Sequence, residues 1–258
     1  MADENVIHHK VELSIWPLVV GISSLIIPFA FMTHFSWGMS FIGLFLAGIA
    51  VAGLLIGLFG WLSEIYSNDQ DVGLSSIAIM MFIVSEVMLF GGMFAGYFYN
   101  MFPAEVWPPA NTPAGVPPLG LALILSVFLI SSSATIHVAE TKLQEGDNSG
   151  FVKWLIITMI LAILFISGQA REWSHLMGQD FTISTNSFGT FFYSITGFHG
   201  SHVVIGIIMQ IFVLLMALQK RLTKKKHTIM KATGYYWHFV DVIWLLVLGL
   251  IYVIPYRG

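Results

Sequence analysis

The chain alternates long apolar stretches with short polar connections. The apolar stretches run for about 20 residues or more without a period of two, which indicates membrane-spanning helices rather than barrel strands. Seven segments follow this pattern, and we predict an all-α integral membrane protein with seven transmembrane helices. They are Trp16–Phe35, Met39–Leu62, Leu74–Tyr99, Leu119–Ala139, Phe151–Ala170, Phe188–Leu218 and Tyr236–Pro255.

The connections divide the chain into four parts. We expect an N-terminal segment at 1–14 on the cytoplasmic or matrix side, helices one and two within 15–62, a connecting segment at 63–73, and helices three to seven within 74–258. With the N-terminus inside, most basic residues fall on inner connections, above all in Lys220–Lys231, and only Arg171 and Arg257 lie outside. The positive-inside rule therefore predicts the N-terminus inside and the C-terminus outside.

Composition supports the membrane assignment and excludes some kinds of bond and site. The chain is 57% hydrophobic and 10% charged, with a mean hydropathy of +0.82, whereas soluble domains carry about 25% charged residues. It has no cysteine, which excludes disulfides and thiolate metal ligands. Nucleic-acid binding is not expected, and no phosphate-binding glycine loop or nucleophile elbow is present.

Glu86 lies deep within the third apolar segment, where an ionisable side chain is costly and usually functional. We expect its carboxyl to be protonated and to face the interior of a helix bundle. Three interpretations stay open: a structural hydrogen bond to another helix, membership of a proton relay, and cation binding.

Two further pairs of polar residues lie in apolar segments. His199 and His202 are three residues apart on one helix face, as are His238 and Asp241. Hydrogen bonding between helices is favoured over metal or haem ligation for the histidine pair, because further ligands are lacking. His238 and Asp241 predict either a buried clasp or an acid–base relay. Arg171 and Glu172 end the fifth apolar segment, where we expect a surface ion pair.

Several short motifs, in this order and spacing, resemble subunit III of haem–copper cytochrome c oxidase over nearly the whole length. They are Trp16-Pro17-Leu18, Ser85-Glu86-Val87, Trp107-Pro108-Pro109, Glu145-Gly146-Asp147, Phe181-Thr182-Ile183-Ser184, Thr196-Gly197-Phe198-His199-Gly200 and Tyr236-Trp237-His238-Phe239-Val240-Asp241.

The resemblance implies two bundles, helices one and two against helices three to seven, separated by a lipid-containing cleft. It implies an accessory non-redox subunit of a proton-pumping oxidase that stabilises the catalytic subunit and supports proton uptake and oxygen access. It places no cofactor on this chain: haem A and copper belong to partner subunits I and II, and cytochrome c or an equivalent donor acts through subunit II. Glu86 stands at the family's membrane-buried carboxyl.

The chain departs from the family pattern at two positions where relatives contact lipid. Where the family often has arginines, this chain has Ser63 and Met216. The expected phospholipid contacts are Trp61, Glu64, Lys220 and Arg221.

Two other functions stay open, a subunit III of a quinol-oxidising relative and a proton- or cation-coupled transporter using Glu86 and Asp241. The expected location is a bacterial cell membrane, with the mitochondrial inner membrane as the alternative.

Overall fold

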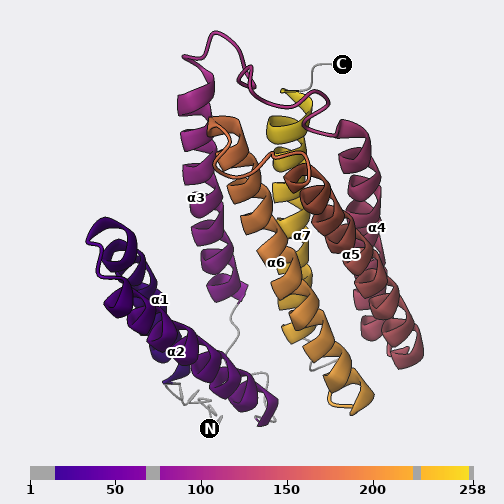
Figure 1. Cartoon of the computed structure of the whole chain (residues 1–258). Coiled ribbons are helices and arrows are strands. Elements are labelled where there is room, and N and C mark those ends of the chain that lie inside the picture. Colours follow the sequence, from indigo (N-terminus) through magenta and orange to yellow (C-terminus); the bar gives the residue numbers. More distant parts are fainter. Residues whose placement is uncertain (1–14, 68–75, 223–227, 256–258) are drawn as a thin grey trace, which may run out of the picture. The chain divides into compact units, whose positions relative to one another are not determined.

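The computed structural model describes residues 15–67, 76–222 and 228–255, and every regular element in them is a helix. The predicted N-terminal segment at 1–14 lies outside the described residues. The elements, shown in Figure 1, are α1 (Trp16–Phe31), η1 (Met32–Ser36), α2 (Ser40–Ser67), α3 (Ser76–Met101), α4 (Leu119–Glu145), α5 (Asn148–Met177), α6 (Ser187–Leu218), α7 (Thr228–Val247) and η2 (Leu248–Val253), where η1 and η2 are π-helical.

The all-helical fold class is confirmed, and each predicted segment corresponds to one of α1–α7. Within the described residues, six helices are long and apolar enough to cross a membrane, with spans in α2, α3, α4, α5, α6 and in α7 continued through η2. The first segment differs, because its apolar helix, Leu18–His34, is shorter than these six. The chain is a multi-pass membrane protein.

Several helices extend beyond their apolar segments. α2 runs to Ser67, so Glu64 is helical where a connection was expected from residue 63. α4 and α5 meet in a tight turn at Gly146 and Asp147. Gly146 adopts a left-handed conformation (φ 85°), which glycine accepts without strain, and the Asp147 side chain accepts a hydrogen bond from the Gly150 amide at 2.9 Å.

The chain forms two compact units, Met1–Gly73 and Leu74–Gly258. In the first unit α1 packs on α2. Glycines allow this close approach: a Cβ at Gly57 would lie 2.8 Å from Val20 Cγ2, and one at Gly60 would lie 2.5 Å from the Trp16 ring. Gly53, Gly57 and Gly60 therefore form a small-residue surface, as is common between membrane helices.

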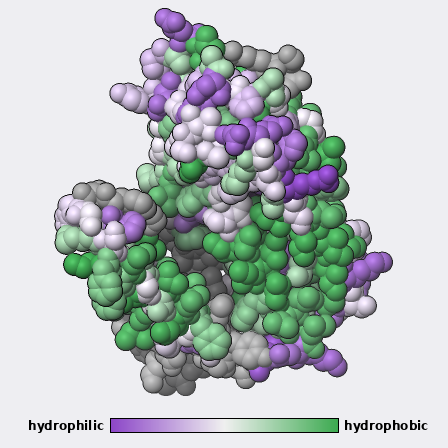
Figure 2. All heavy atoms as spheres, in the orientation of Figure 1, coloured by the Kyte–Doolittle hydropathy of each residue, from purple (hydrophilic) through white to green (hydrophobic). Residues whose placement is uncertain are grey.

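In the second unit α4–α7 form a ring in which each helix packs on the next and α7 closes against α4, while α3 packs on α6 and α7. Two indoles on α7 fasten it to α4: Trp237 Nε1 donates to Ser132 Oγ at 2.9 Å, and Trp244 Nε1 donates to Ser126 Oγ at 2.8 Å. Apolar side chains cover the middle of this unit on the face shown in Figure 2, and polar ones gather near its ends.

Candidate functional site

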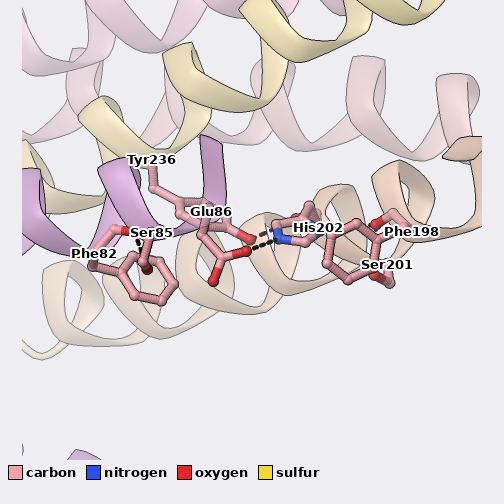
Figure 3. A network of polar contacts seen from close by, with 7 residues as sticks. All are labelled: Phe82, Ser85, Glu86, Phe198, Ser201, His202 and Tyr236. Atoms are coloured by element: carbon pink, nitrogen blue, oxygen red, sulfur yellow. Dashed lines mark hydrogen bonds and ion pairs between the residues drawn. The ribbon is translucent and has the colours of Figure 1, made fainter. Parts of the chain in front are cut away.

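Glu86 lies on α3, ten residues after the start of the helix, and it contacts α6. Its Oε2 lies 2.9 Å from Nε2 of His202, and the two side chains are 13% and 7% exposed. Of His199 and His202, the structure brings His202 to Glu86. This contact joins two helices whose sequence positions are far apart (Figure 3).

The second ring nitrogen of His202, Nδ1, determines which residue of the Glu86–His202 pair can donate the hydrogen bond. Nδ1 lies 2.8 Å from the Phe198 carbonyl oxygen, which can only accept, so Nδ1 carries a hydrogen and donates. Neutral His202 then has a bare Nε2, and Glu86 must be the protonated donor. Charged His202 would donate from Nε2 to a Glu86 carboxylate. Both forms place one hydrogen between Oε2 and Nε2.

Aromatic rings enclose the His202 imidazole. The Phe198 and Phe90 centroids lie 4.7 and 5.2 Å from the His202 centroid, and the Tyr236 ring stacks at 6.3 Å. The Tyr236 hydroxyl also donates to the His202 carbonyl at 3.3 Å. Figure 3 shows Glu86 extending from α3 toward His202. An apolar enclosure strengthens such a hydrogen bond.

His199 faces a different part of the bundle. It is 1% exposed and its ring lies 5.2 Å from that of Trp244 and 5.9 Å from that of Phe165. Neither ring nitrogen has a hydrogen-bond partner among the described residues. His199 and His202 therefore do not act on one partner, although they are three residues apart.

His238 and Asp241 lie at the α4–α7 contact. His238 Nδ1 is 2.7 Å from Ser133 Oγ on α4, whereas Asp241 Oδ2 is 4.0 Å from the same nitrogen. The His238 side chain is 42% exposed and that of Asp241 is 10% exposed. The short contact of His238 is thus with Ser133, a residue that the sequence did not single out.

The remaining predicted site residues lie elsewhere. Glu64 lies in α2, and Lys220 and Arg221 follow the end of α6. Trp61 also lies in α2, but its side chain is outside the described part of the chain. Across residues 15–67, 76–222 and 228–255, no group of three or more His, Cys, Asp or Glu side chains could hold a metal ion.

The expectation of a surface pair at Arg171 and Glu172 is wrong. Glu172 is 2% exposed and its Oε2 accepts hydrogen bonds from Gln169 and Tyr252. The apolar run ends at Ala170, but α5 continues to Met177. The helical period could have predicted that Glu172 is buried. Gln169 and Glu172 continue the buried face of α5 that contains Thr158, Ala162 and Phe165.

The family model described as cytochrome c oxidase subunit III matches residues 7–256. The chain belongs to the cytochrome c oxidase subunit III family. This membership confirms the resemblance read from the sequence motifs.

Curated members of the subunit III family occur in bacteria and fungi. Cytochrome c oxidase subunit 3 of Mycosarcoma maydis is 31% identical over 260 residues, which cover 95% of this chain and 93% of that protein. The Synechocystis protein of the same description is 35% identical over 74% of this chain and 80% of its own length. The Neurospora crassa protein is 37% identical over 76% of this chain and 77% of its own length. As a subunit III, the chain is a non-catalytic subunit of the cytochrome c oxidase complex, and its partners are other oxidase subunits.

Proposed function

We propose that this subunit III serves a proton-pumping cytochrome c oxidase as an accessory, non-redox subunit. It docks on catalytic subunit I, with subunit II as a further partner, stabilises subunit I, and supports its proton uptake and oxygen access. Haem A and copper stay on the partner subunits, and cytochrome c or an equivalent donor acts through subunit II.

The Glu86–His202 hydrogen bond is the observation that carries this proposal. It places one exchangeable hydrogen between α3 and α6 inside an apolar enclosure. The imidazoles of His202 and His238 are engaged by Glu86 and Ser133 rather than turned toward a shared ligand. Intramembrane groups of this kind usually support proton movement or interhelical contact.

Three further features belong to the proposal. Phospholipid binds in a cleft between helices one and two and helices three to seven, with Trp61, Glu64, Lys220 and Arg221 as its contacts. The N-terminus lies inside and the C-terminus outside. The membrane is the bacterial cell membrane, and the mitochondrial inner membrane is the alternative.

Depletion of this chain from the purified oxidase tests the accessory role. We expect haem and copper contents to stay unchanged, because no redox centre is lost, and oxygen consumption to decay several-fold faster during sustained turnover. Adding the chain back should restore the slower decay. Loss of all haem upon depletion, or an unchanged rate of inactivation, would contradict the proposal.

A further inference from the structure

The most deeply buried carboxyl among the described residues of α3–α7 is that of Glu172, and the Glu86–His202 pair does not use it. Glu172 lies near the end of α5, at the end of the bundle that also carries the α5–α6 turn and η2 (Figure 1). Gln169 Nε2 donates to Glu172 Oε2 at 2.6 Å, and the Tyr252 hydroxyl donates to the same oxygen at 3.0 Å. Gln169 and Glu172 are 4% and 2% exposed, and Tyr252 is fully buried.

The local structure brings all three side chains to the interior. Gln169 and Glu172 lie on the buried face of α5. Tyr252 comes from the π-helical segment η2, in which the consecutive residues Ile251 and Tyr252 are both fully buried. Successive residues of a regular α-helix point about 100° apart, so the wider π turn helps both to face the core. π-Helical turns occur frequently at functional sites.

Glu172 has no counter-ion among the described residues that would stabilise an ionised carboxyl. Within the described residues it forms no ion pair with a basic side chain, and the adjacent Arg171 is exposed. The titratable groups that act on it from the packed elements are the hydroxyls of Tyr193 on α6 and Tyr252 on η2. An ionised carboxyl buried without a counter-ion is strongly disfavoured, so the site requires a positive charge or a proton.

The hydrogen bonds to Glu172 indicate which of its two oxygens carries that proton. Both donated hydrogen bonds reach Oε2 of Glu172, whereas Oε1 of Glu172 and Oε1 of Gln169 have no partner among the described residues. Both unpartnered atoms are acceptors when Glu172 is ionised. A proton on Glu172 Oε1 turns one of these two unpartnered acceptors into a donor.

We propose that Gln169, Glu172 and Tyr252 form a second proton-binding site of this chain, in which Glu172 is a neutral carboxylic acid that carries its proton on Oε1. The ligand is a proton rather than a metal cation. The site is independent of the Glu86–His202 pair, so either assignment can fail without the other.

Infrared spectroscopy of the intact oxidase tests the site. At neutral pH, the difference between wild type and Glu172→Gln should contain one protonated-carboxyl C=O band that moves on transfer to D₂O. Glutamine keeps the acceptor for Gln169 and Tyr252, so we expect the variant to assemble. Glu105→Gln, in the exposed loop, is the matched control and should remove a carboxylate band instead.

Tyr252→Phe provides a second variant that retains Glu172. Because it removes one hydrogen bond to the carbonyl oxygen, the same C=O band should remain and move to higher frequency. A carboxylate band lost in Glu172→Gln, or shifted in Tyr252→Phe, would overturn the proposal. So would a protonated band that turns into a carboxylate band when sodium, potassium or lithium chloride is added, since the ligand would then be a metal cation.

Discussion

At the scale of single residues, the carbonyl of Phe198 fixes the chemistry of the Glu86–His202 pair. Because it occupies Nδ1 of the ring, His202 has only Nε2 left for Glu86, at 2.9 Å. The pair therefore has one shared hydrogen and two protonation states that differ only in its position. In an apolar enclosure the neutral state avoids two buried charges.

Reaction with a hydrophobic carbodiimide tests whether the Glu86 carboxyl is protonated. We expect the reagent to modify Glu86 in the intact oxidase, because such reagents partition into lipid and react with protonated carboxyl groups. Glu86→Gln should abolish modification of α3, as measured by mass spectrometry of its peptides. Glutamine can still donate to His202, so the fold should persist.

Glu105→Gln is the control for this labelling, since Glu105 lies in an exposed loop rather than in an apolar segment. It should leave the modification of α3 unchanged. If Glu86→Gln left the modified α3 peptide as abundant as in wild type, Glu86 would not be the reactive carboxyl.

The sequence predicted some of these residue-level features and not others. The depth of Glu86 was sufficient to expect a partner on another helix, but both His199 and His202 lie at a similar depth. Their directions differ by about 60° around α6, and only helix packing decides which one faces α3. Glu172 was misassigned because hydropathy marks where an apolar run ends, whereas the buried face of α5 continues past it.

At the scale of elements, a single glycine sets the approach of α6 to α7. A Cβ at Gly206 would lie 2.6 Å from Trp237 Cε3 and Cζ3, and Trp237 is fully buried and bonded to Ser132. Gly206→Ala should therefore force the helices apart and cost about 1–3 kcal/mol. Thermal unfolding of the purified oxidase, followed through loss of this chain, measures the effect.

Gly120→Ala is the matched control, because an added Cβ there meets no heavy atom within 4 Å. It should leave the unfolding temperature of the chain unchanged or slightly raised, since alanine favours helix over glycine. Equal losses in the two variants would show that the Gly206–Trp237 contact does not limit the packing of α6 on α7.

That the described elements are helical was predictable, whereas their ends and the two π-helical segments were not. Apolar runs mark only the lipid-embedded part of a helix, and α2, α4 and α5 continue past them to Ser67, Glu145 and Met177. The π-helical turn η2 has no hydropathy signal at all. It depends on tertiary contacts such as the 2.8 Å hydrogen bond from the Tyr97 hydroxyl to the Leu250 carbonyl.

At the scale of the whole molecule, three polar contacts between elements of the described residues 76–222 and 228–255 are separate from one another. Glu86 meets His202 between α3 and α6, Ser133 meets His238 between α4 and α7, and Glu172 meets Tyr252 between α5 and η2. Aromatic rings pack beside these contacts: the Trp244 ring meets that of Phe165 edge to face at 4.7 Å and lies 5.9 Å from the Tyr252 ring. Such an arrangement suits a subunit that acts through a partner better than one that conducts ions itself.

Reconstitution of the full chain alone into lipid vesicles distinguishes these two functions. Because these polar contacts join different pairs of elements and share no residue, we expect an imposed pH gradient to decay no faster than in protein-free vesicles. The intact oxidase in the same lipid, supplied with an electron donor and oxygen, is the positive control for proton translocation. Glu86→Gln and Asp241→Asn in the isolated chain should leave the decay unchanged. A gradient that collapsed through the wild-type chain and was preserved by either variant would instead assign this protein to the proton-coupled transporters.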